Sequence, residues 1–332
     1  MKRSRRLGLA ALAVVVALAG CENGGATRTL GITAIGTVRG VVYFDANGSR
    51  ARDAADVGFA GARIRLLTAG GTDTLFRATT AADGSFRIAG VPVGTYAVVV
   101  DSASAGDTAR VIAPNPRAVT VLPGDSVELV AAISFPIRTI AQARALAPGE
   151  RLFVRGIALH ARETFSDTTL NVVDATGAMR ATRVRPSTSP VAAGDSVILR
   201  ARIATRLGQR VLDDVTTFVV SPTFIPSAPT VTTAVAATGG TAGSLDAALV
   251  ILTNAQVIDT ATVGGNFQMT MNDASGPLVV VLDRAADVGF RAPLPAGLYV
   301  PTSRFDLVGV LVPTGTGAWR LKPRSALDLT RR

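Results

Sequence analysis

Residues 36–67 read GTVRGVVYFDANGSRARDAADVGFAGARIRLL, and this stretch decides how the first part of the chain folds. Before Asp45 and after Gly61, apolar side chains alternate with polar ones, which is the period-two pattern of strands with one buried face. The intervening polar loop, residues 43–58, is rich in Asp, Asn, Ser and Arg. The stretch therefore predicts two β-strands joined by a polar loop.

The same alternation recurs along the chain, with Gly, Pro, Asp or Asn between the short apolar runs. The runs include residues 85–88, 96–100, 126–130, 152–155 and 196–203. Turn signals about every 8–12 residues indicate an all-β protein built of sandwiches or barrels. Two short helices are expected, one over residues 139–146 and one near residues 231–237.

An internal repeat organises the last two thirds of the chain. LNVVDATGAM (170–179) aligns with MTMNDASGPL (269–278). The repeat predicts two copies of one small β module, residues 137–220 and 231–332, joined by the proline-containing linker 221–230. Both copies resemble the OB-like modules of secreted bacterial nucleases and envelope lipoproteins, which implies small closed β-barrels.

Residues 36–136 resemble the B-like domain of serine-aspartate repeat adhesins and the carboxypeptidase regulatory-like domain. The matching segments are the strand GTVRGVVYFD, the polar loop and DGSFRIAGVPVGTY (83–96). The resemblance implies a β-sandwich. The expected fold class is all-β, with an N-terminal transthyretin/Ig-like β-sandwich followed by two small OB-like β-barrels.

In the B-like family the polar loop binds calcium, and this loop keeps the spacing of oxygen ligands in a twelve-residue calcium loop. The candidate ligands are Asp45, Asn47, Ser49, Asp53 and Asp56. Ser49 stands where Asn or Asp is usual, and Arg50 stands where Gly usually makes a sharp turn. Two hypotheses follow: a structural calcium site, or a loop that keeps its shape through contacts between Arg and Asp without the ion.

Residues 1–21 predict a signal peptide, with the basic segment MKRSRR followed by an apolar run that ends in Leu18-Ala19-Gly20-Cys21. This ending resembles the lipobox of bacterial lipoproteins, in which the Cys becomes the lipidated first residue. An ordinary secretion signal is the alternative. Residues 22–35 are expected to be a tether. The resemblance implies a lipid-anchored cell-envelope protein, and Glu22 after Cys21 indicates the outer membrane if the cell has two membranes.

Most catalytic chemistry is excluded by composition. The chain has one Cys and one His, so it cannot form an internal disulfide, a Cys-rich zinc site or a His-pair metal site. His160 has no nucleophile motif and is expected to be a surface or loop histidine. Asp174 and Asp273 each lie in a D-A-[ST]-G sequence, which indicates a turn, and Asp213-Asp214 is similarly expected at a hairpin tip. We therefore expect a non-enzymatic protein that needs no cofactor other than the calcium ion considered above.

The excess of basic over acidic residues in the mature chain is concentrated in residues 137–220, which hold twelve arginines and seven acidic residues. The strand pattern places Arg183 with Arg185, and Arg200 with Arg202, on common faces of the first OB-like module. Two functions are considered. The first is a structural or adhesive module that binds a protein or glycan partner. The second is binding of nucleic acid or another anion through these arginines, with a solvated arginine face as the simpler interpretation.

Overall fold

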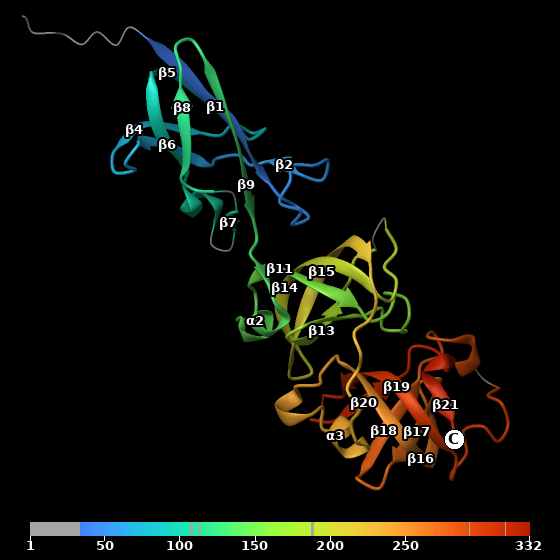
Figure 1. The fold of residues 1–332 in the computed structure, drawn as a ribbon. Helices are drawn as coiled ribbons and strands as arrows, with labels where there is room; N and C mark the ends of the chain where they lie inside the picture. The colour runs from blue at the N-terminus through green and yellow to red at the C-terminus, as the bar shows by residue number, and fades with distance from the viewer. Residues whose placement is uncertain (1–33, 107–108, 113, 187–188, 292, 316) are drawn as a thin grey trace, which may run out of the picture.

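The computed structural model describes residues 34–106, 109–112, 114–186, 189–291, 293–315 and 317–332. The predicted signal peptide, Cys21 and almost all of the tether lie outside the described residues. The predicted fold class is confirmed: a two-sheet sandwich is followed by two small closed barrels, and the three modules follow one another in a row (Figure 1). The helices of the described ranges are all too short or too polar to traverse a bilayer.

The sandwich packs two sheets around one core. In one sheet β1 (Ile35–Phe44) pairs with β5 (Ser85–Pro92) on one side and runs parallel to β9 (Ser126–Ser134) on the other. Alternate residues of β1, such as Val38 and Val42, are fully buried, as period-two alternation predicts. The remaining elements are β2 (Val57–Gly58), β3 (Arg63–Thr68), β4 (Thr74–Thr79), β6 (Gly94–Val100), η1 (Ser102–Ala105), β7 (Arg110–Val111) and β8 (Arg117–Val121).

The first barrel closes through five strands in the order β11-β12-β13-β15-β14, with β14 pairing back onto β11. Closure leaves no exposed edge among these strands, which protects the module from pairing with other chains. Its elements are β10 (Ile137–Arg138), α2 (Ile140–Ala145), β11 (Arg151–Ala158), β12 (Leu170–Asp174), β13 (Gly177–Thr182), β14 (Asp195–Arg206) and β15 (Gln209–Pro222).

The second barrel repeats this topology in the order β16-β17-β18-β20-β19, and β19 pairs back onto β16. The hairpin of the repeat, β12 with β13, recurs as β17 with β18, so the internal repeat seen in the sequence is a repeat of structure. The elements are α3 (Thr233–Ala237), η2 (Thr241–Gly243), β16 (Leu249–Val263), β17 (Asn266–Asn272), β18 (Pro277–Leu282), η3 (Val288–Phe290), β19 (Arg304–Pro313), β20 (Trp319–Lys322), η4 (Ala326–Asp328) and β21 (Leu329–Arg331).

Both expected helices form, and the repeated D-A-[ST]-G turn holds each in place. In the first barrel Asp174 Oδ2 accepts a hydrogen bond from the Ile140 amide at 2.8 Å, and Thr176 Oγ1 accepts one from the Ala141 amide at 3.0 Å. Asp174 also accepts a hydrogen bond from the Thr176 amide within the turn, as the sequence predicts. A helix of six residues is marginal by itself, so these caps from a distant hairpin stabilise its first turn.

The second barrel repeats the cap. Asp273 Oδ2 accepts a hydrogen bond from the Thr233 amide at 3.0 Å, and Ser275 Oγ accepts one from the Ala234 amide at 3.0 Å. Burial of its carboxyl group would by itself raise the pKa of Asp273. Hydrogen bonds from Ser275, Thr233 and two backbone amides outweigh this effect and lower the pKa to about 2.

The two barrels pack against each other through an apolar cluster that includes Leu159 and Leu249. Asn171 Nδ2 of the first barrel donates to the Ala247 carbonyl of the second at 3.2 Å. His160 lies beside Asn171 in the bend after β11, so the loop alternative is confirmed, but the residue is only 1% exposed and the surface alternative was wrong. Its other ring nitrogen lies 2.8 Å from the Ala161 carbonyl, and burial lowers the pKa of His160. Packing of the hairpin and the second barrel, which the local sequence does not reveal, accounts for this burial.

Replacing the capping aspartate tests this arrangement. We expect Asp273→Ala to lower the free energy of unfolding of the second barrel by about 1 kcal/mol at pH 7, the usual cost of losing such a cap. The folded-state pKa of Asp273, about 2, lies below the ordinary value of 3.8 for an aspartate. The cap therefore contributes fully above about pH 4, and its contribution is lost as the pH falls toward 2.

Denaturant unfolding followed by the fluorescence of Trp319 measures this effect, since the single tryptophan of the chain lies in the core of the second barrel. The exposed Asp259→Ala is the matched control for loss of one carboxylate. Equal stability of Asp273→Ala and the wild type at pH 7 would contradict the capping role.

Candidate anion-binding cleft

The polar loop after β1 is organised around Asp45, which is fully buried. Asp45 Oδ1 accepts a hydrogen bond from the Ser49 amide at 3.1 Å, and Oδ2 accepts one from the Arg50 amide at 3.0 Å. The Ser134 hydroxyl donates to the Asp45 carbonyl at 2.9 Å and ties the loop to β9. Arg50 has a φ of 65°, so the sharp turn that glycine usually makes at this position of a calcium loop is present although a non-glycine residue makes it.

The other acidic side chains of the loop also accept hydrogen bonds from within it. Asp56 accepts from the amides of Ala46 at 3.0 Å and Asp53 at 2.9 Å. Asp53 Oδ2 accepts from Asn47 Nδ2 at 2.8 Å and from Ser49 Oγ at 3.2 Å. The Asn47 bond is the largest of the effects that lower the pKa of Asp53.

The loop therefore brings the five candidate calcium ligands together but points its carboxylates at N–H and O–H donors. Among the described residues no group of three or more acidic, His or Cys side chains is arranged to hold a metal ion. In this arrangement the donor set does not fit calcium. Neither Arg50 nor Arg52 forms an ion pair within the described part of the chain, so backbone amides and the side chains of Asn47 and Ser49, not arginines, satisfy the carboxylates. Calcium binding by this loop stays a hypothesis from the sequence, and these contacts favour a loop that keeps its shape without the ion.

The same loop docks on the first barrel. Gly48, at φ 72°, is buried so close to Phe153 and Ile198 that an added Cβ would lie 3.4 Å from Ile198 Cγ2. Arg200 Nη1 donates to the Ala46 carbonyl at 3.5 Å, a long hydrogen bond between the two modules. The loop is thus part of the junction between the sandwich and the first barrel.

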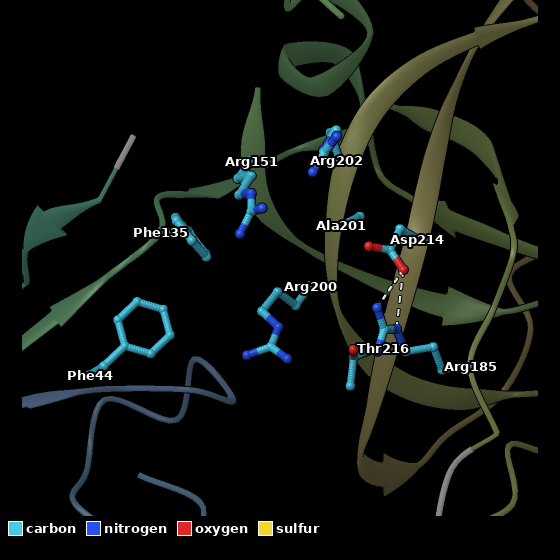
Figure 2. A pocket seen from close by; sticks show the side chains of 9 residues that line it. All are labelled: Phe44, Phe135, Arg151, Arg185, Arg200, Ala201, Arg202, Asp214 and Thr216. Carbon is cyan, nitrogen blue, oxygen red and sulfur yellow. Dashed lines mark hydrogen bonds and ion pairs between the residues drawn. The ribbon is translucent and has the colours of Figure 1, made fainter. Parts of the chain in front are cut away.

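A cavity of about 330 Å³ opens at this junction (Figure 2). We call it the arginine cleft; its lining residues are Phe44, Phe135, Arg151, Arg185, Arg200, Ala201, Arg202, Asp214 and Thr216. Figure 2 shows Arg200 between the two phenylalanines on one side and the pair of Arg185 and Asp214 on the other. The sandwich side contributes an aromatic wall, and the barrel contributes the charges.

Strand pairing in the barrel brings the arginines together. Arg151, at the start of β11, lies directly opposite Arg202 of β14. Arg200 precedes Arg202 by two residues, and the pairing of β14 with β15 is irregular between them. Arg185 follows β13 and is held by Asp214, whose Oδ1 accepts from Arg185 Nη2 at 2.7 Å. Four arginines from three segments therefore face one cavity.

Most of this positive charge is not balanced by nearby acids. Arg151, Arg200 and Arg202 form no ion pair with a carboxylate of the described residues, and Asp214 is the only acidic residue that lines the cleft. Burial, followed by the charges of Arg185 and Arg151, lowers the pKa of Arg200. An anion placed in the cleft would relieve this repulsion, so the geometry suits a carboxylate, sulfate or phosphate group.

The sequence located part of this site. Arg185, Arg200 and Arg202 lie together as expected, but Arg183 does not line the cleft, because its side chain forms two hydrogen bonds with Asp213, of which Nε to Oδ1 spans 2.8 Å. The expectation that Asp213 and Asp214 form a hairpin tip was wrong, since both lie within β15.

Arg151 was missed by the sequence reasoning. Its signal was available in the run RLFVR (151–155), where it opens the strand directly before three buried apolar residues. The run does not reveal the strand register that places Arg151 opposite Arg202.

Comparison with known proteins confirms the resemblance of the first module. Residues 49–134 match the carboxypeptidase regulatory-like domain family. No curated protein matches the chain. The solved structures with similarity include GBS52, the minor pilin of the gram-positive pathogen Streptococcus agalactiae, at 16% identity and a TM-score of 0.25, covering 31% of this chain and 45% of the pilin.

Two further structures are the group B streptococcus pilus 2b backbone protein and the hypothetical protein ygiW from E. coli. The backbone protein is 20% identical with a TM-score of 0.21, over 31% of this chain and 41% of its own. The ygiW protein is 17% identical with a TM-score of 0.22, over 25% of this chain and 89% of its own. The chain thus covers less than half of either streptococcal protein.

The calcium hypothesis is tested by thermal unfolding in calcium and in chelator. Because each loop carboxylate already accepts hydrogen bonds from the loop, we expect the unfolding midpoint of the sandwich to be the same in both conditions. A ligand that binds only the folded state would raise the midpoint by mass action. A rise of several degrees in calcium, absent in Asp53→Asn, would establish the calcium loop instead.

Proposed function

We propose that this chain is a non-enzymatic, lipid-anchored cell-envelope protein that binds an acidic polysaccharide through the arginine cleft. The observation that carries the proposal is the convergence of Arg151, Arg200 and Arg202, none of them ion-paired within the described residues, on one cavity between two modules. Guanidinium groups bind carboxylate and sulfate groups through paired, charge-assisted hydrogen bonds.

The shape and composition of the cleft favour a sugar with acidic substituents. Phe44 and Phe135 form an apolar wall, and the arginines of the barrel lie across from it (Figure 2). A pyranose ring has apolar C–H faces, and a uronic or sulfated sugar adds the anionic group on its edge. The cavity of about 330 Å³ is in the range of small-molecule pockets.

Single-stranded nucleic acid is the second candidate, because the barrel carries arginines beside aromatic rings. The arrangement of the rings favours the polysaccharide. Phe44 and Phe135 pack edge to face with centroids 5.3 Å apart, and Phe135 lies 6.1 Å from Phe153. The two rings of the wall lie edge to face and form one short surface, whereas proteins that bind single strands offer aromatic faces on which successive bases stack.

A binding role is supported by the chemistry that lines the cleft. Its only carboxylate, Asp214, is bound to Arg185, and its only hydroxyl belongs to Thr216. His160, the sole histidine, is buried in the barrel interface with both ring nitrogens near hydrogen-bond partners. General-base activation of a nucleophile needs a titratable group within reach of the hydroxyl or water.

The placement of the modules fits an anchored arm. β1 and β9 run parallel, from Thr37 beside Ser126 to Phe44 beside Ile133. The start of β1 therefore lies at the end of the sandwich far from the barrels (Figure 1). A lipid on Cys21 would hold that end at the membrane and leave the cleft and both barrels projecting outward.

Lipid anchoring predicts the behaviour of a Cys21→Ser chain. We expect the wild-type protein to sediment with membranes and to enter the detergent phase in phase partitioning, since buried acyl methylenes stabilise membrane binding by about 0.8 kcal/mol each. The Cys21→Ser protein should appear in the soluble fraction. Membrane association of both proteins would contradict the lipid anchor.

Polysaccharide binding predicts the effect of removing the cleft arginines. We expect Arg200→Met and Arg202→Met each to weaken binding of polygalacturonate or heparin about tenfold or more, because a charge-assisted hydrogen bond contributes about 1.5–3 kcal/mol. Added salt should weaken wild-type binding. Affinity chromatography and calorimetry measure both effects.

Arg117→Met, at an exposed position of the sandwich, is the control for loss of one positive charge. Equal affinity of the cleft variants and the control for the polysaccharides would refute the proposed site. Stronger salt-dependent retention on single-stranded DNA than on either polysaccharide, lost in the cleft variants, would assign the cleft to nucleic acid instead.

A further inference from the structure

A second cavity, of about 290 Å³, lies between the two barrels and is separate from the arginine cleft. The first barrel contributes Ser166, Asp167, Arg180 and Leu207 to its lining. The second barrel contributes residues from β16 to β20, among them Asn266, Gln268, Asp283, Arg320 and Lys322. We call this cavity the inter-barrel pocket.

Part of its charge is already balanced across the interface. Lys322 Nζ lies 2.8 Å from Asp283 Oδ2 and 3.5 Å from Asp167 Oδ2, and it stands 4.3 Å from the centroid of the Phe165 ring. Asp283 is fully buried and accepts a hydrogen bond from Ser166 Oγ at 2.9 Å. These contacts join the two barrels, and their groups have partners.

Arg180, in contrast, has buried nitrogen atoms without hydrogen-bond partners. It is 7% exposed, it lines the pocket, and its Nε and Nη2 atoms are buried without a hydrogen-bond acceptor. No carboxylate of the described residues lies within ion-pair distance of it. Burial lowers the pKa of Arg180, and the charges of Asp246 and Asp167 oppose this effect in part. Burial of a guanidinium group without hydrogen-bond acceptors is unfavourable, and this cost falls when an anion lies next to the group.

The sum of the lining charges sets the charge of the ligand. Arg180, Arg320 and Lys322 face Asp167 and Asp283, which leaves one positive charge in excess. A dianion such as phosphate would be repelled by the two carboxylates, whereas a monocarboxylate would balance the excess. Gln268 and Asn266 add side-chain amides that can bind hydroxyl groups.

We propose that the inter-barrel pocket binds a small hydroxylated monocarboxylate of the hexuronic acid class. The carboxylate compensates Arg180, and the hydroxyl groups of the sugar contact Asp167 and the amides of Asn266 and Gln268. This site does not depend on the arginine cleft, because the two cavities share no lining residue.

Titration with sodium glucuronate tests the proposal on the full mature chain carrying Cys21→Ser. We expect the side-chain amide signals of Asn266 and Gln268 to shift on titration in nuclear magnetic resonance spectra. Calorimetry should give tighter binding of glucuronate than of acetate, glucose or phosphate. Arg180→Met should weaken glucuronate binding at least tenfold, whereas Arg117→Met, at an exposed position of the sandwich outside both cavities, should leave it unchanged.

Arg180→Met removes a buried charge without hydrogen-bonded compensation, so we expect the variant to fold, and its unfolding midpoint checks this. If it fails to fold, Gln268→Ala takes its place and should also weaken binding. The proposal is overturned by absence of glucuronate binding at millimolar concentration, by equal binding of glucose, or by unchanged binding in a folded Arg180→Met. Loss of binding only in Arg202→Met would place the sugar acid in the arginine cleft and overturn it equally.

Discussion

The candidate site depends on the hydrogen bonds that the buried carboxylate of Asp45 accepts. Because it accepts hydrogen bonds from the backbone amides of Ser49 and Arg50, it holds the polar loop in a tight curl. The curl brings Gly48 against Phe153 of the first barrel and presents the Ala46 carbonyl to Arg200. A loop whose spacing resembles a calcium site thus positions one module against another, and the arginine cleft is the space that remains beside that contact.

The two barrels are joined by polar contacts that a single module could not satisfy. Asp283 of the second barrel accepts a hydrogen bond from the Ser166 hydroxyl of the first barrel, and the ammonium group of Lys322 balances the charge of Asp283. Buried ion pairs often contribute little net stability, because desolvation offsets the attraction, but removal of one partner leaves a costly unpaired charge. We infer that these groups favour one orientation of the barrels. The inter-barrel pocket is a consequence of that orientation.

Several features could be predicted because they are local. The alternation in β1, the repeated hairpin and the turn role of Asp174 are visible in short windows of sequence. The predictions that failed concern the burial or the strand pairing of a residue in the folded protein. His160 reads as a polar loop residue but is buried by elements distant in sequence, and Asp213 reads as part of a turn but lies in a strand that pairs with Arg202.

The sequence alone determined the fold class, the order of the modules and the internal repeat, because period-two alternation and turn residues act over a few neighbouring positions. Tertiary structure alone decided which charges share a cavity. Arg151 faces Arg202 only because β11 pairs with β14, and Arg183 leaves the group only because Asp213 binds it. Strand register and module docking join residues far apart in the chain, so no local pattern carries that information.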